Sequence, residues 1–116
     1  MAGLLSPQAQ QKVAALHQMS EKVQHVYGLV ERFAAVRDQH QAEVLSQPLK
    51  RAFGKLKRDL MGQGFDTMAQ LAGSMEIAAG RGSAVQTKAR ILREGVGSLR
   101  FQVEHEARQV VAEDER

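Results

Sequence analysis

A dense basic cluster in the middle of the chain is the feature most able to do chemistry. Five Lys and Arg side chains fall within nine residues that contain no acid: Lys50, Arg51, Lys55, Lys57 and Arg58. Cations displayed on a helix neutralise phosphates, and counterion release then gives salt-dependent binding that tolerates many sequences. The cluster therefore predicts a polyanionic partner. A charge run is more often only a solvated helix face, and that alternative stays open.

A second group of cations follows later in the chain and ranks behind the first: Arg81, Lys88, Arg90 and Arg93. Tyr27 and four phenylalanines offer too few aromatic rings for single strands to be held by base stacking. We expect binding to depend on charge and shape, with RNA favoured over DNA.

Other site chemistries are poorly supported. Glu21 and His25 miss the Glu-x-x-His spacing of di-iron bundles by one residue, and the absence of cysteine excludes thiolate sites. Ser83 is interpreted as a helix cap, and no histidine or acid is fixed by spacing near Ser46, Ser74 or Ser98. Gly80-Arg81-Gly82 precedes a helix and could hold an anion there, but we interpret it first as a short linker. We expect a protein that is not an enzyme and that holds no metal or cofactor.

Composition favours one helical domain spanning residues 1–116. Hydrophobic residues make up 43% of the 116, aromatic residues only 4%, and there is no Trp, so a Leu, Val, Ala and Met core suits helix packing. The net charge of +3 is mildly basic. Neither a signal peptide nor a membrane span is evident, so we expect a soluble, cytoplasmic protein.

The first predicted helix covers residues 7–45. Ser6 suits the N-cap and Pro7 the first helical position, where a missing N–H costs nothing. Two series spaced by seven form a bundle-like seam: Ala9, Leu16, Val23 and Val30, with Met19, Val26 and Phe33. The same stripe is extended by Val36, His40 and Val44. The helix could break near Asp38.

The second predicted helix covers residues 48–79 and begins at Pro48, which favours helix starts. Its apolar face contains Leu49, Phe53, Leu56, Leu60, Met68, Leu71, Met75 and Ala78. The five clustered cations lie opposite the first part of that face and should point to solvent. Gly62-Gln63-Gly64 is a weak point, and we expect a continuous, kinked helix there rather than a turn.

The third predicted helix covers residues 84–112. Gly80-Arg81-Gly82 ends the preceding helix with glycine at a left-handed position, and Ser83 with Gln86 predicts a capping box. The apolar stripe of this helix contains Val85, Ala89, Leu92, Val96, Leu99, Val103 and Val110. The expected fold is an all-α antiparallel bundle of three long helices, or four if the chain turns at residues 62–64.

We also expect several copies of the chain to associate. Helices of roughly 30 residues would be rods about 45 Å long, which make a thin bundle for one copy. The heptad seam of the first helix and apolar residues beyond one face suggest surface buried by other copies: Leu29, Ile77, Ile91 and Phe101.

Residues 71–107 resemble the central hairpin of a known small four-helix-bundle family. The shared features are the corner Ala-Gly-Arg-Gly-Ser and the motif Gly-Val-Gly-Ser-Leu-Arg-Phe, within LAGSMEIAAGRGSAVQTKARILREGVGSLRFQVEHEA. The stretch HVYGLVERF at residues 25–33 is similar to the family's first helix. The family includes the ribosomal-RNA intervening-sequence proteins and the accessory variability determinant of diversity-generating retroelements. The resemblance implies a basic, ring-forming bundle that binds a reverse transcriptase and its template RNA.

The favoured function is thus a non-catalytic, oligomeric bundle that binds RNA as an accessory subunit of a reverse-transcriptase-type system. The main alternative is a scaffold or adaptor that binds a partner protein through its heptad seams while its charges only solvate it. A helical metal or cofactor carrier ranks third.

Overall fold

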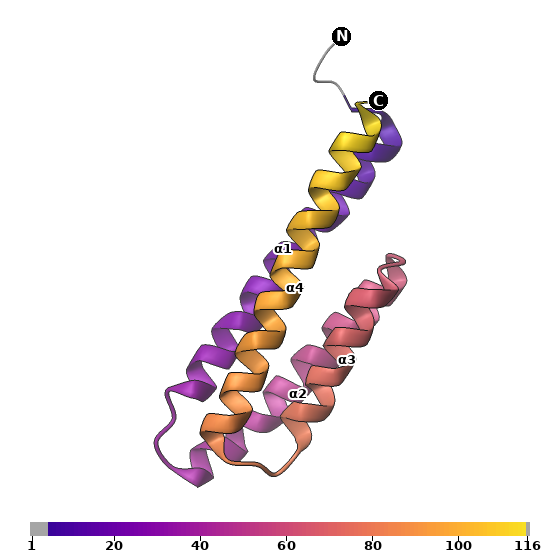
Figure 1. The fold of residues 1–116 in the computed structure, drawn as a ribbon. Helices are drawn as coiled ribbons and strands as arrows, with labels where there is room; N and C mark the ends of the chain where they lie inside the picture. The colour runs from indigo at the N-terminus through magenta and orange to yellow at the C-terminus, as the bar shows by residue number, and fades with distance from the viewer. Residues whose placement is uncertain (1–4, 116) are drawn as a thin grey trace.

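A computed structural model describes residues 5–115, and over that range the chain forms four α-helices and no strand. The helices are α1 (Pro7–Ala34), α2 (Gln39–Gly62), α3 (Asp66–Gly80) and α4 (Val85–Asp114). Successive helices run antiparallel; α1 packs along α4, and α2 forms a hairpin with α3 (Figure 1). The all-α prediction is confirmed, with four helices rather than three.

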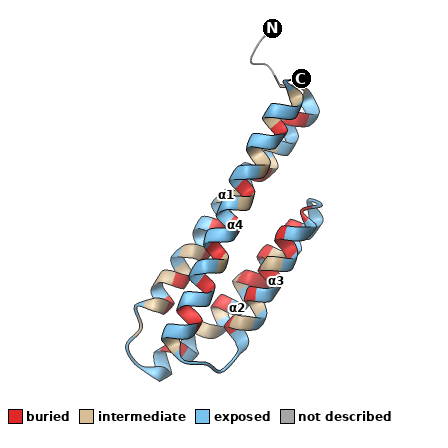
Figure 2. Ribbon diagram, in the orientation of Figure 1, coloured by how far each residue is buried: buried red, intermediate tan, exposed pale blue. Residues whose placement is uncertain are grey.

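The core lies along the facing sides of the four helices (Figure 2). All seven residues of the predicted α1 seam are buried, and so is the predicted α4 stripe except the half-buried Val85. The first four residues of the predicted α2 face are buried as well. Hydrophobic periodicity therefore identified the inward faces correctly, and the α1 seam is buried by helices of its own chain.

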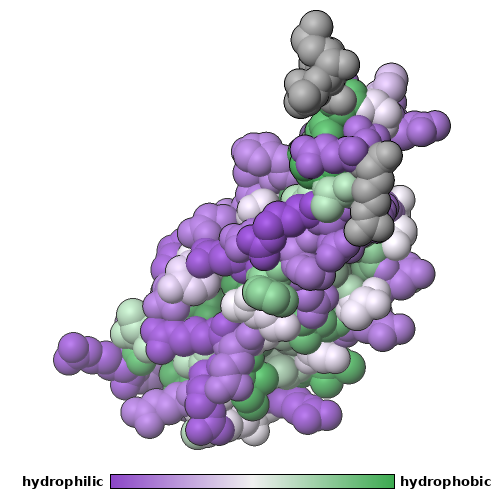
Figure 3. All heavy atoms as spheres, turned by 45° about the horizontal axis from the view of Figure 1, so that its top comes forward, coloured by the Kyte–Doolittle hydropathy of each residue, from purple (hydrophilic) through white to green (hydrophobic). Residues whose placement is uncertain are grey.

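Large apolar side chains that remain exposed are distributed over three helices. They are Val44 and Met61 on α2, Ile77 on α3, and Ile91 and Phe101 on α4. Figure 3 shows one face on which hydrophilic side chains predominate and hydrophobic ones emerge between them. Leu29, also expected to be available to other copies, is half-buried. Association of copies stays a prediction, and the α1 seam no longer requires it.

The long pair α1 and α4 extends beyond the α2–α3 hairpin as a two-helix stalk, and the whole bundle measures 57 × 22 × 15 Å (Figure 1). Hydrogen bonds of Ser6 join α1 to α4 at the end of this stalk. The Ser6 hydroxyl accepts a hydrogen bond from the Ala9 N–H at 3.2 Å and donates to Asp114 Oδ1 at 2.7 Å. The Ser6 N–H donates to Asp114 Oδ2 at 2.9 Å. These two donors hold the pKa of the Asp114 carboxyl below its usual value.

One helix over residues 7–45 is not formed, and the alternative of a break near Asp38 is confirmed, because the chain turns between Ala34 and Gln39. Asp38 favours a new helix at this point, because its side chain accepts a hydrogen bond from the Gln41 N–H at 2.8 Å and caps the N-terminus of α2. His40 and Val44 are exposed, so the expected extension of the α1 stripe through them is also wrong.

Pro48 does not begin a helix but lies inside α2. Proline in a helix interior removes one backbone donor and is costly, so the surrounding packing must hold this segment helical. Ala42 and Leu49, on either side of Pro48, are both buried. Burial on one continuous face therefore outweighs the local preference of proline.

The chain turns at Gly62-Gln63-Gly64, so the expected continuous helix over residues 48–79 is wrong. The Phe65 N–H donates to the Leu60 carbonyl at 2.9 Å, and the Gly64 N–H donates to the Met61 carbonyl at 3.0 Å. Gly64 has a φ of +81°. This is a Schellman motif with glycine at its left-handed position, and buried Phe65 and Leu60 supply its apolar contact.

The predicted capping box at Ser83 and Gln86 is not formed. The N-cap of α4 is Ala84, and no side chain caps this helix end. Gly80 does end α3, as predicted, but without a left-handed residue, since among residues 5–115 only Gly64 has a glycine-favoured φ. An extended Arg81 follows instead.

Gly95 allows α3 and α4 to approach closely. A Cβ atom at Gly95 would collide with the Met75 sulfur and lie 2.8 Å from its Cγ, whereas a Cβ at Gly97 would meet no heavy atom within 4 Å. Both glycines lie inside α4, where alanine is intrinsically favoured by roughly 0.5–1 kcal/mol. The two positions therefore form a matched pair that separates packing from helix propensity.

We expect Gly95→Ala to lower the free energy of unfolding by about 1–2 kcal/mol, because overpacking displaces buried Met75. Gly97→Ala should raise it by about 0.5 kcal/mol. Urea unfolding monitored by circular dichroism measures both. Equal effects of the two substitutions would contradict the close packing of Gly95 against Met75.

We expect Ser6→Ala to move the Asp114 pKa up toward its usual value, because one of its two donors is lost. The contact stabilises the fold above the ordinary carboxyl pKa and is lost as the pH falls through the lowered folded-state pKa. An NMR titration of the Asp114 carboxyl measures this. Ser74→Ala, which removes a hydroxyl bonded only to Gln70, is the control. An unchanged Asp114 titration in Ser6→Ala would show that the contact is absent in solution.

Candidate nucleic-acid interface

The five clustered cations lie on the solvent side of α2. Because α2 is continuous from Gln39 to Gly62, all five project from one rigid helix, opposite its buried row of Leu49, Phe53, Leu56 and Leu60. Four are exposed, namely Lys50, Arg51, Lys55 and Arg58, and Lys57 is half-buried. The predicted exposure to solvent is confirmed for these four, while Lys57 is partly covered by α3.

Two of these lysines extend across α3. A Cβ atom at Gly80 would lie 3.3 Å from Cδ and 3.7 Å from Nζ of Lys50, and one at Gly73 would lie at the same distances from Cδ and Nζ of Lys57. The lysine stems therefore pack on bare glycine backbone. Long cationic side chains commonly cover neighbouring surface with their apolar stems in this way, while the charged group stays solvated. As a result, the positive charge extends over both helices of the hairpin.

None of the five cations makes an ion pair within 4 Å with a carboxylate of the described chain. The nearby acid Asp59 is paired instead with Lys22 of α1, at 3.0 Å. The α2 helix carries five Lys and Arg residues against Glu43 and Asp59, an excess of three that equals the net charge of the whole chain. The field of the protein is thus concentrated on this helix.

The second group of candidate cations does not form one surface. Arg81 is exposed at the α3 C-cap, and Arg90 is exposed on α4. Arg93 is engaged: its Nε and Nη2 each donate to the Glu31 carboxylate at 2.8 Å. These hydrogen bonds lower the pKa of Glu31 and raise the pKa of Arg93. Arg93 is therefore largely neutralised by α1, unlike the α2 cations.

Lys88 was expected among the surface cations, but it is buried with 6% of its surface exposed. Its Nζ donates to the Ala79 carbonyl at 3.2 Å and to the Ser46 hydroxyl at 3.4 Å, and lies 5.6 Å from the centre of the Phe33 ring. Burial lowers the pKa of this ammonium. Lys88 joins the ends of α1, α2 and α3 and cannot face a phosphate outside the bundle.

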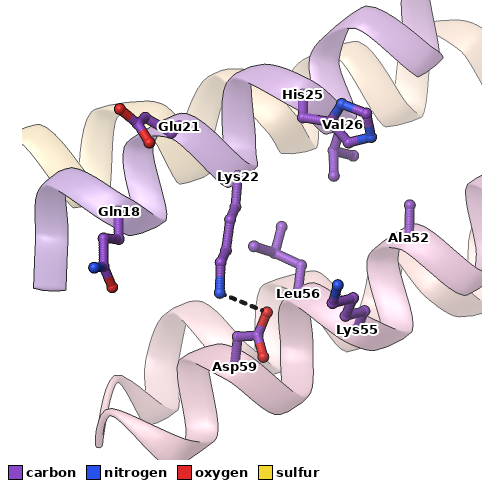
Figure 4. Close-up of a pocket in the computed structure, with 9 residues that line it drawn as sticks. All are labelled: Gln18, Glu21, Lys22, His25, Val26, Ala52, Lys55, Leu56 and Asp59. Atoms are coloured by element: carbon purple, nitrogen blue, oxygen red, sulfur yellow. Dashed lines mark hydrogen bonds and ion pairs between the residues drawn. The ribbon is translucent and has the colours of Figure 1, made fainter.

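Beside the basic face lies a groove of about 380 Å³ between α1 and α2. Val26, Ala52 and Leu56 form an apolar floor, while Lys22 reaches across from α1 to meet Asp59 of α2 (Figure 4). Lys55 and His25 also line this groove. The Lys22–Asp59 pair bridges the groove and leaves Lys55 as its free cation on α2.

No Phe or Tyr ring of the described residues is placed to stack on a base beside the cluster. Phe33, Phe53 and Phe65 are buried, and Tyr27 is half-buried with the Arg100 guanidinium 5.1 Å above its ring. Phe101 is exposed, but it lies on α4 and stacks on His105. The geometry of α2 therefore fits contact with phosphates and not with bases.

The histidines do not converge. His17 pairs with Glu21 on α1 at 3.4 Å, and His105 lies on α4 beside Phe101. Within residues 5–115 no three His, Asp or Glu side chains gather closely enough to hold a metal ion.

Sequence reasoning missed two residues of this surface, Gly54 and Glu76. Glu76 comes from α3 and covers Gly54 in the middle of the basic cluster. The position of Gly54 could have been found from the sequence, because the cations flank it at three and four residues on each side. Glu76 lies over Gly54 only because α2 and α3 pack as a hairpin, so the spacing of residues does not indicate this contact.

Comparison of the chain with protein-family models, curated proteins and solved structures finds no match. The resemblance to the intervening-sequence and retroelement bundle family therefore stays a prediction. None of the helices in the described part of the chain is long and apolar enough to cross a membrane.

We expect Lys88→Gln to leave retention on a heparin column unchanged, because its ammonium is turned into the bundle. Lys57→Gln, the same substitution on the α2 face, should elute at lower salt. Lys88→Gln should also destabilise the fold by about 1 kcal/mol through the weakened hydrogen bond to Ala79. Equal loss of retention in the two variants would contradict the burial of Lys88 in solution.

Proposed function

We propose that the protein is a non-catalytic helical bundle that binds RNA through the phosphates of its backbone. The observation that carries the proposal is the set of five cations on α2 with no described acid within ion-pairing distance. The helix that carries these cations is already formed, so its backbone need not be ordered on binding, and contact with phosphates releases counterions. The absence of a neighbouring Phe or Tyr platform in the described chain favours contact that does not depend on base sequence.

The more specific role is that of an accessory subunit in a reverse-transcriptase-type system, which follows from the resemblance of residues 71–107. The arrangement of four antiparallel helices agrees with the fold that the resemblance implies. Association of several copies would multiply the α2 surface and strengthen binding to a long RNA through multivalency.

The adaptor alternative has less support than RNA binding. Its heptad seam on α1 is buried against α4 and α2 of the same chain, so the residues that would bind a partner protein are occupied. RNA binding, by contrast, uses side chains that are exposed.

The test compares the wild-type chain with a variant in which Lys50, Arg51, Lys55, Lys57 and Arg58 are all glutamine. Fluorescence anisotropy with a short labelled RNA is recorded between about 50 and 200 mM salt. With five phosphate contacts the logarithm of affinity should fall against that of salt with a slope of roughly −3.5 to −4.5, and the variant should show almost no slope. A DNA of the same sequence tests the preference for RNA.

Arg108→Gln is the single-charge control, since Arg108 is exposed on α4 and lies outside the α2 cluster. It should change RNA affinity less than twofold. RNA binding that survives the loss of all five α2 cations would refute the proposal and favour the adaptor role.

A further inference from the structure

Gly54 is the centre of a ring of four cations. Residues three and four positions apart are neighbours on a helix surface. Lys50 and Arg51 precede Gly54 by four and three residues, and Lys57 and Arg58 follow it by three and four. The sequence Lys-Arg-x-x-Gly-x-x-Lys-Arg is therefore symmetric about a position that has no side chain.

The carboxylate of Glu76 lies in the middle of this ring. A Cβ atom at Gly54 would collide with Oε2 of Glu76 and lie 3.2 Å from its Cδ, and it would be 3.9 Å from Nη1 of Arg58. Gly54 is buried and Glu76 is half-buried, because the acidic side chain covers the bare backbone. A carboxylate from α3 thus takes the place that a side chain at position 54 would fill.

The Glu76 carboxylate is not bound to any one of the four cations. No ion pair within 4 Å joins its carboxylate to a cation of the described chain. It is held by packing over Gly54 rather than by a bidentate contact. A carboxylate and a phosphodiester each carry one negative charge on two free oxygens, so the position that accepts the first also suits the second.

We propose that the four cations around Gly54 form a binding site for one backbone phosphate of RNA, and that Glu76 occupies it in the free protein as an internal competitor. The inference rests on the proposed function and adds a regulatory contact to the same surface. Binding displaces the Glu76 side chain toward solvent and places the phosphate over Gly54, where Lys50, Arg51, Lys57 and Arg58 can reach its oxygens. Glu76 lowers the affinity for single phosphates and favours ligands that make several contacts at once.

The first test compares Glu76→Gln with Glu43→Gln, in the RNA anisotropy assay. Both changes remove one negative charge from the hairpin, but Glu43 lies on α2 eleven residues before Gly54 and does not cover it. Loss of the competitor should raise RNA affinity about fivefold in Glu76→Gln, the size of one charge interaction near 4 Å in water. Glu43→Gln should raise it less than twofold.

The second test is a double-mutant cycle with Gly54→Ala. The Cβ of alanine at position 54 takes the position of the Glu76 carboxylate. The added methyl group therefore excludes both the Glu76 carboxylate and a phosphate that would bind over Gly54. Glu76→Gln should therefore give less than a twofold gain in the Gly54→Ala background, so that the two substitutions are coupled. Circular dichroism checks that each variant keeps its helices.

The outcomes separate the two proposals. If the wild-type chain shows no salt-dependent RNA binding, the proposed function fails. If RNA binds but Glu76→Gln and Glu43→Gln behave alike, the function stands, the competitor role of Glu76 is wrong and its charge acts only at long range. The competitor role is also wrong if Glu76→Gln gains affinity equally with glycine or alanine at position 54.

Discussion

The bare backbone of glycine at the contact between α2 and α3 is the constraint on which the surface of this protein depends. Gly73 and Gly80 leave room for two lysine stems to cross α3, and Gly54 leaves room for an acidic side chain to cross back onto α2. A Cβ at any of these positions would meet a charged side chain from the other helix. The hairpin can therefore be narrow and still spread its charges over both helices.

The pairing of α1 with α4 uses polar contacts that are separate from the α2 charges. Three acids are engaged between the long helices: Glu31 with Arg93, Glu106 with Lys12, and Asp114 with Ser6. The contacts hold the long pair together along its length, down to the end of the stalk. None of these contacts involves the α2 cations, which face solvent or, around Gly54, the Glu76 carboxylate of α3.

Much of the candidate site could be anticipated from residue spacing, and one part could not. Cations placed opposite an apolar row on a helix point outward, which is why the exposure of four of the five α2 cations could be predicted. Lys88 could not be placed in this way, because its position next to the apolar stripe of α4 allows either direction. Its burial depends on the Ala79 carbonyl and the Phe33 ring, which are brought to it by other helices.

The sequence by itself determined the all-α class and which face of each helix is buried, since these follow from periodicity among near neighbours in the chain. The tertiary structure decided where the helices stop. Pro48 is held inside a helix by burial of residues on both sides, while Gly64 turns the chain because Leu60 and Phe65 pack together across it. Local preferences at such points differ by only a few kcal/mol, so packing between distant segments can override them. The same long-range packing brings Glu76 to Gly54, which no spacing along the chain specifies.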